Sequence, residues 1–284
     1  AFQQALNRVV ARHETLRTTF GSIKGRPVQL VSEFQTRHFP VIDLSGAVDP
    51  EAAARQIMDD EAQSPFDLRR GPLFRAHILR LSANEHLALF NLHHIVSDAQ
   101  SFELLRREIS ECYEAVRAGR KAALPFLPVQ YLDYALWQRE RFQSGLLERE
   151  LAYWKQHLAG AAASQEFPCD FSRDGDAFKG ASERFALPMA TVQALKEMSR
   201  REGATLFMAV LAALGALLHR WIGSNDVVVG APFSGRGRAE TENLIGLFVN
   251  TLPLRLRVNR EMAFSELLVH VRETVLGVFA HQET

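Results

Sequence analysis

The stretch that most constrains this chain is a predicted strand that ends in two adjacent histidines and leads directly into a predicted helix. Residues 87–94 are mostly apolar, which favours a strand. Residues 101–118 carry apolar side chains at intervals of three and four, the spacing of a helix with one buried face. Ser97 or Asp98 suits the helix N-cap, because a short polar side chain can accept hydrogen bonds from free amides. The sequence therefore places two histidines at a strand end and an aspartate at a helix start.

Alternation along the strand separates the two histidines. Successive side chains of a strand point to opposite faces, so His93 is expected on the face of Asn91 and His94 on the face of Leu92. We predict that His94 faces a site and that His93 supports it, since a neutral imidazole can accept or donate a proton near neutral pH. A metal site is the alternative, but no third ligand stands nearby in CxxC or HxxxH spacing, so no metal is predicted.

Length and composition limit the class of protein. The chain has 284 residues, 47% of them apolar, which is typical of one large or two smaller globular domains. Its formal net charge is zero and it has no long basic run, so nucleic acid is not an expected partner. Residues 205–218 are shorter than the roughly 20 residues of a membrane span, which favours a buried helix and no membrane contact. Two cysteines and no signal peptide favour a reducing, cytoplasmic location.

Further helices and strands are predicted from apolar periodicity. Helices are expected over residues 1–13, 51–62, 131–158, 189–201 and 206–221, and strands over 74–81, 184–187, 226–230 and 244–255. A glycine-rich loop is expected over residues 232–238. It lacks the spacing and lysine of a phosphate-binding loop and the flanking glycine of a serine-hydrolase elbow, so neither activity is indicated.

The sequence around the histidines resembles the HHxxxDG signature of nonribosomal peptide synthetase condensation domains, which belong to the chloramphenicol-acetyltransferase-like superfamily of acyltransferases. Other stretches resemble further motifs of that family, in the family's order. They are RHExLRTxF, PFDLxxGPLxR, YxDYAxW and IGxFVNTLPxR, at residues 12–20, 65–75, 131–137 and 245–255. The final His281-Gln282 resembles the start of the family's HQxxPFE motif, so the resemblance covers essentially the whole chain.

The resemblance implies an α/β fold of two chloramphenicol-acetyltransferase-like subdomains in a V-shaped pseudo-dimer. The N-terminal subdomain, with the histidine motif, is expected over residues 1–165, and a C-terminal subdomain over residues 166–284. The boundary is placed here because residues 159–180 have the composition of a linker. Members of the family extend further at both ends, so the chain is expected to be truncated and its second subdomain incomplete.

The resemblance also implies a reaction. It is amide formation between a donor acyl or peptidyl thioester and an aminoacyl acceptor, each carried on the phosphopantetheine of a carrier protein. No permanently bound cofactor is expected, and the expected partners are carrier proteins and neighbouring adenylation domains. Two alternatives remain. One is a coenzyme-A-dependent acyltransferase of the same superfamily, although the chain lacks a DFGWG-like motif. The other is a non-catalytic platform that docks carriers.

The histidine motif supplies the implied catalytic residues. His94 is the expected catalytic group, either as general base or in positioning the amine, and His93 is expected to brace the site. Cyclising members of the family would have aspartates at these two positions. Asp98 is expected to cap the following helix and to form a buried pair with Arg255 or Arg17, whose motifs converge on the site in relatives.

The remaining site residues are also implied by the resemblance. Arg12 and Arg17 are expected near the base of the active-site tunnel as scaffold charges. Ala99 stands where the family has glycine, and it is expected to line the tunnel together with the region of Asn250. A glycine at such a turn can supply a permissive backbone, so the methyl group of Ala99 either narrows the tunnel or is harmless.

Overall fold

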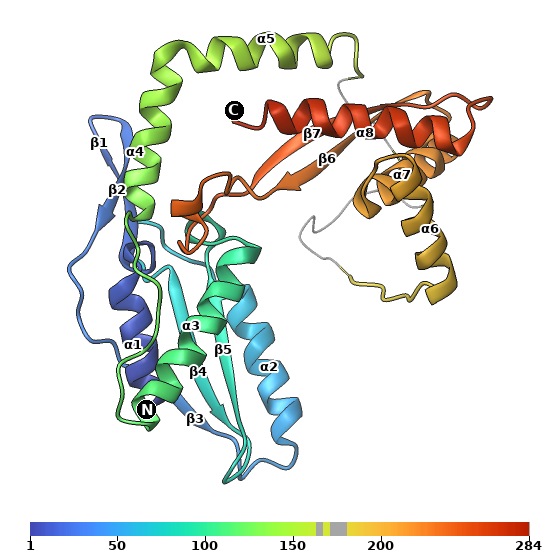
Figure 1. Ribbon diagram of the computed structural model, residues 1–284. Coiled ribbons are helices and arrows are strands. Elements are labelled where there is room, and N and C mark those ends of the chain that lie inside the picture. The colour runs from blue at the N-terminus through green and yellow to red at the C-terminus, as the bar shows by residue number, and fades with distance from the viewer. Residues whose placement is uncertain (163–166, 171–180, 284) are drawn as a thin grey trace. The chain divides into compact units, whose positions relative to one another are not determined.

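The two histidines follow the last strand of a three-stranded sheet. Figure 1 labels the strands of this sheet. In this computed structural model the sheet has the order β3 (Val41–Asp43), β4 (Phe74–Arg80) and β5 (His86–Leu92). β3 runs parallel to β4, whereas β4 and β5 are antiparallel. The strand predicted over residues 87–94 is confirmed as β5, except that it ends at Leu92 and leaves both histidines beyond it.

Helices cover both faces of this sheet. α1 (Phe2–Arg12) and α3 (Ala99–Arg117) share a buried cluster with Phe74 of β4. α2 (Pro50–Gln63) packs on the other face, in a smaller cluster with Leu79. Because strand side chains alternate between faces, β4 contributes apolar residues to both clusters. The predicted helices over residues 1–13, 51–62 and 101–118 are thereby confirmed.

A hairpin follows the first helix. A short 3₁₀ turn, η1 (Glu14–Arg17), leads into β1 (Thr18–Ile23), which pairs antiparallel with β2 (Arg26–Val31). The two connecting residues, Lys24 and Gly25, have φ angles of 51° and 77°. Two positive φ angles in a two-residue connection define the turn whose twist matches that of paired strands.

The described residues fall into two units. The structure describes residues 1–162, 167–170 and 181–283. The first unit comprises Ala1–Gln143 and Ser234–Val249, and the second comprises Ser144–Phe233 and Asn250–Thr284.

This division differs from the predicted subdomains. The predicted boundary between residues 165 and 166, like most of the linker predicted over 159–180, lies outside the described residues. The first unit instead ends at Gln143, and the segment Ser234–Val249 returns to it. That segment contributes Ile245, which is 1% exposed, to the core cluster of α1 and α3. Local composition carries no signal for a contact between residues so far apart in the chain, so a linear division missed it.

The helix predicted over residues 131–158 is two helices. α4 (Tyr131–Arg141) and α5 (Leu147–His157) are separated by a non-helical break within Phe142–Leu146. Gly145 has a φ of 85° in this break. Glycine adopts this left-handed conformation without a steric penalty and so ends the helical run.

The second unit is built on a two-stranded sheet. β6 (Asp226–Phe233) pairs antiparallel with β7 (Asn250–Arg257). The helices of this unit are α5, α6 (Met189–Arg201), α7 (Leu206–Ile222) and α8 (Phe264–Ala280). The predicted helices over residues 189–201 and 206–221 and the strand over 226–230 are confirmed, the strand continuing to Phe233.

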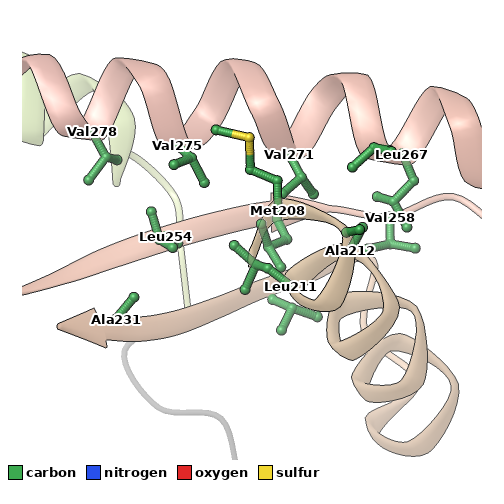
Figure 2. Packing of buried hydrophobic residues seen from close by; sticks show 14 of the residues in the cluster. Met208, Leu211, Ala212, Ala231, Leu254, Val258, Leu267, Val271, Val275 and Val278 are labelled. Atoms are coloured by element: carbon green, nitrogen blue, oxygen red, sulfur yellow. The ribbon is translucent and has the colours of Figure 1, made fainter. Parts of the chain in front are cut away.

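The core of the second unit lies between α7, α8 and the sheet. Figure 2 shows Met208 of α7 pointing toward α8 beside Val271, with Leu254 of β7 beneath that helix. α7 approaches β7 closely at Gly215, where a Cβ atom would lie 2.9 Å from the Leu256 side chain. A larger residue at this position would push the helix away from the strand.

One face of α7 departs from the prediction of a buried helix. A second apolar row, at spacings of three and four, is between 38% and 59% exposed; it consists of Phe207, Val210, Leu214, Leu217 and Trp221. Apolar periodicity does not show which apolar face has a partner. Among the described residues no single helix is long and apolar enough to cross a membrane, and α6 and α7 pass that test only as a pair bent by 104°.

Two predicted strands are wrong in whole or in part. Residues 184–187 form no strand. All of residues 181–188 are exposed, so the alternation of apolar and polar residues does not reflect a strand with one buried face. The strand predicted over residues 244–255 begins only at Asn250. Leu244 and Ile245 are 1% exposed but lie in a loop, because their apolar character reflects burial in the first unit rather than strand pairing.

Candidate active site

The histidine pair forms a short turn beyond β5. His93 extends the ladder by one bond, since its N–H donates to the carbonyl of Leu73 at 3.0 Å. His94 is already part of the 3₁₀ turn η2 (His94–Val96). Strand alternation therefore still applies at His93 but does not determine where His94 points, and the geometry of the turn takes its place.

His94 is held through one ring nitrogen. Its Nδ1 lies 2.7 Å from the carbonyl oxygen of Ser97. A carbonyl can only accept, so in the neutral ring Nδ1 carries the proton and Nε2 carries the lone pair. The residue is exposed, and among the described residues no hydrogen bond to Nε2 is found. Nε2 can therefore accept a hydrogen bond from a substrate.

His93 has the opposite tautomer. Its Nδ1 accepts a hydrogen bond from the backbone N–H of Ile95 at 3.0 Å and so caps the turn that contains His94. The lone pair is then on Nδ1 and the proton of the neutral ring on Nε2. The ring also contacts Phe66 edge-to-face, with a centroid distance of 5.7 Å. The two adjacent histidines thus have different tasks in the local structure.

Asp98 is buried and fully hydrogen-bonded. One carboxylate oxygen accepts from the N–H and hydroxyl of Ser101 at 2.8 and 2.7 Å, which caps α3 as predicted. The other oxygen accepts from the N–H of Phe248 at 3.1 Å. Burial alone would raise the pKa of Asp98, but the hydrogen bonds from Ser101 and the charge of Arg236 outweigh it and lower the pKa.

Arg236 is the charged partner of Asp98. Its Nη2 lies 3.0 and 3.1 Å from the two carboxylate oxygens. The other terminal nitrogen donates to the carbonyls of Thr241 and Leu244, each at 2.7 Å. Its guanidinium also stacks over the ring of Phe248 at 4.0 Å. Arg236 thereby fixes the loop around η4 (Ala239–Thr241) to the start of α3.

The two arginines predicted as partners of Asp98 are bound elsewhere. Arg255 pairs with Asp226 in the second unit, with Nη2 2.6 Å from the carboxylate. Arg17 pairs with Glu14 at 3.3 Å and donates to the carbonyl of Ser32. The predicted kind of interaction, a buried aspartate–arginine pair, is correct, but its predicted members are wrong.

Arg12 belongs to a second buried cluster. Its Nε lies 3.1 Å from the carboxylate of Glu108, which is fully buried in α3. His13 donates to the same carboxylate from Nε2 at 2.8 Å. Burial opposes the ionisation of Glu108, but the hydrogen bond from His13 and the charge of Arg12 lower its pKa overall. Arg12 thus joins α1 to α3 as a scaffold charge, and its place near a tunnel stays a prediction.

The two predicted tunnel residues lie in different units. Ala99 is exposed and is the first residue of α3. Lys24 is the only non-glycine residue with positive φ in the described part of the chain, so Ala99 has a backbone that needs no glycine. Asn250 begins β7 and donates to the carbonyl of Gln282 at 3.1 Å. Their shared role in a tunnel stays a prediction.

Sequence reasoning missed Arg236. The only local signal was its position between two glycines, in a predicted glycine-rich loop that lacks the spacing and lysine of a phosphate-binding loop. The arginine does bind an anion, but the anion is the side chain of Asp98, 138 positions away.

Among the described residues no group of three or more His, Cys, Asp or Glu side chains is arranged to hold a metal ion.

Known proteins resemble this chain over its whole length. The family model of the condensation domain matches residues 1–284. A linear gramicidin synthase of Brevibacillus parabrevis is 44% identical over 286 residues, covering 100% of this chain but 4% of that protein. Phosphinothricin tripeptide synthetase PhsC of Streptomyces viridochromogenes is 40% identical, covering 100% of this chain and 26% of that protein. The chain thus spans a small part of the curated relatives it matches.

A solved structure agrees with these relatives. The first condensation domain of the CDA synthetase has a TM-score of 0.82 and 28% identity, covering 100% of this chain and 68% of that chain. This likeness confirms the predicted α/β, chloramphenicol-acetyltransferase-like class. Within that class, the chain belongs to the condensation domain family, as its motifs had indicated.

Proposed function

We propose that this chain catalyses amide bond formation in nonribosomal peptide synthesis. The donor is an acyl or peptidyl thioester and the acceptor an aminoacyl thioester, each on the phosphopantetheine of a carrier protein. The relatives that match the whole chain are peptide synthetases, which supports this substrate class. Carrier proteins and adenylation domains of the same assembly are the proposed partners.

The observation that carries the proposal is the 2.7 Å contact between Nδ1 of His94 and the carbonyl oxygen of Ser97. Because Nδ1 donates to Ser97, Nε2 is the basic nitrogen. We propose that it accepts a hydrogen bond from the attacking amine. The amine nitrogen then forms a bond to the thioester carbonyl carbon, the C–S bond breaks, and the nitrogen loses a proton. The phosphopantetheine thiol leaves in its protonated form, so one thioester and one amine give one amide and one thiol.

The buried pair of Asp98 and Arg236 has a supporting role in this proposal. Asp98 caps the helix that begins directly after the histidine turn, and Arg236 satisfies its charge. A fixed helix start keeps the Ser97 carbonyl in place, where it accepts the hydrogen bond from Nδ1 of His94. Holding both thioester arms near one basic nitrogen contributes by proximity, since the encounter of amine and carbonyl becomes intramolecular.

The test is a condensation assay with loaded donor and acceptor carriers, compared with acyl-coenzyme A and a soluble amine. We expect transfer between carriers and little transfer from coenzyme A, because tethering raises the effective concentration of both reactants. Rapid transfer from coenzyme A with none between carriers would instead indicate a coenzyme-A-dependent acyltransferase. Carrier binding without any transfer would indicate a docking platform.

A further inference from the structure

Two stacked side chains, Phe66 and Arg75, lie next to His93 of the histidine turn. Phe66 follows α2 in the chain, and its ring contacts His93 edge-to-face with an interplanar angle of 86°. The guanidinium of Arg75 lies over the Phe66 ring, 3.9 Å from its centroid. Phe66 is therefore held by a cation–π contact on the strand side and contacts the imidazole of the turn.

Arg75 is itself fixed from several directions. It lies on β4, opposite Asn91 of β5, and its Nε donates to Glu61 near the end of α2. Its terminal nitrogens donate to the carbonyls of Ser64 and Pro65 at 2.8 and 3.1 Å. Arg75 thus ties the segment that leads to Phe66 onto the sheet. Because its planar fork makes these contacts and the stack together, lysine cannot replace it.

The turn that contains His94 is short, and one of its bonds depends on the His93 ring. It spans three residues, and its backbone bonds are Val96 N–H to the carbonyl of His93 at 3.0 Å and Ser97 N–H to that of His94 at 3.2 Å. Such short 3₁₀ turns have poor hydrogen-bond geometry. Side-chain bonds add to these: His94 Nδ1 donates to the carbonyl of Ser97 at 2.7 Å, and the Ser97 hydroxyl donates to that of His93 at 3.4 Å. A third bond, from Ile95 N–H to Nδ1 of His93, requires one orientation of the His93 ring.

We infer that Phe66 and Arg75 are positioning residues for the proposed condensation reaction. Arg75 fixes Phe66, Phe66 fixes the ring plane of His93, and His93 holds Ile95 and so the turn with His94. Neither residue touches the reacting atoms. This inference rests on the proposed function of His94. Its structural part is that the bond from Ile95 N–H to His93 depends on Phe66, and this part is tested without an activity measurement.

The test compares four variants of the protein by amide hydrogen exchange at Ile95 and by condensation kinetics. In Phe66→Leu and Arg75→Lys we expect the amide hydrogen of Ile95 to exchange about fivefold to tenfold faster. This factor corresponds to the free energy of one aromatic or cation–π contact. The kcat of condensation should fall by a similar factor at unchanged KM for the loaded carriers. Phe66→Tyr keeps the ring and should behave as wild type. Arg80→Lys is the matched control, because Arg80 lies on the same strand and pairs with Asp43 without stacking on a ring.

Unchanged Ile95 exchange in both Phe66→Leu and Arg75→Lys would overturn the inference. If Phe66→Leu does not fold, Arg75→Lys decides alone. A rise in exchange without a fall in kcat, in a protein whose His94→Ala variant is inactive, would also overturn it. An active His94→Ala variant would instead refute the proposed function, and the exchange at Ile95 would still decide whether Phe66 holds the turn.

Discussion

Arg236 reaches both carboxylate oxygens of Asp98 with one nitrogen, at 3.0 and 3.1 Å, although 138 positions separate the two residues. The side chains are 2% and 5% exposed. This pair joins the segment Ser234–Val249 to the helix that follows the histidine turn. The stability of the site therefore depends on a loop that lies far away in the sequence.

Asp98→Ala should destabilise the protein strongly. The substitution leaves Arg236 buried without its carboxylate and removes the cap of α3, so we expect a loss of about 3–5 kcal/mol in the free energy of unfolding. Denaturant unfolding measures it. Asp43→Ala is the control, because it breaks the exposed pair with Arg80 and should change stability little. Equal stability of the Asp98→Ala variant and wild type would show that the pair contributes nothing.

The protein should lose stability in acid. The pKa values of Asp98 and Glu108 lie below their ordinary values in the folded state. The stability that these groups contribute is therefore complete above their unfolded pKa, near 4, and is lost as pH falls through the lower folded pKa. Denaturant midpoints measured from pH 7 downward should fall in this range. The Asp98→Asn variant should show a smaller decrease, and a decrease equal to that of wild type would rule out Asp98 as a contributor.

The local features of this site could be predicted from the sequence, and its long-range features could not. The N-cap at Asp98 depends on residues within one helical turn, and the sequence placed it correctly. The partner of Asp98 was assigned to Arg255 or Arg17, because one sequence does not record which distant arginine shares a buried site. The loop containing Ile245 has the apolar composition of a strand, but its burial comes from packing against α1 and α3.

The histidine turn shows the same limit. Alternation placed His93 and His94 on opposite faces, which assumes a strand that continues through both. The strand instead ends at Leu92, and the hydrogen bond from Ile95 N–H to Nδ1 of His93 closes the turn that follows. The glycine-dependent break at Gly145 and the returning segment after Phe233 likewise depend on conformation and packing that apolar periodicity does not encode.

Gly235→Ala should destabilise the loop that carries Arg236. Gly235 has a φ of 63°, and a Cβ atom there would lie 2.0 Å from the carbonyl oxygen of Phe248. Backbone strain alone costs about 1–3 kcal/mol, and the contact adds to it. Gly237→Ala is a control in the same loop, since no heavy atom lies within 4 Å of its Cβ position. Similar unfolding free energies for the two variants would contradict this explanation.

Ala99→Gly should leave the transfer activity unchanged. Ala99 has an ordinary helical backbone at the start of α3, so glycine offers no conformational advantage there. We expect a loss of at most about 1 kcal/mol in stability, from the lower helix propensity of glycine, and an unchanged transfer rate between carriers. A clear increase in rate in the glycine variant would show instead that the methyl group obstructs the substrate path.

The role of His94 is decided by the rate of transfer between loaded carriers in two folded variants, His94→Ala and His93→Ala. If Nε2 of His94 binds the attacking amine, His94→Ala should lose about 10²–10⁴-fold in rate at nearly unchanged stability, the range for loss of a positioned acid–base group. His93→Ala should lower the melting temperature, because its ring caps the turn through Ile95, and should reduce the rate at least as much as Phe66→Leu but less than His94→Ala. A folded His94→Ala variant that transfers at the wild-type rate would contradict the proposed role.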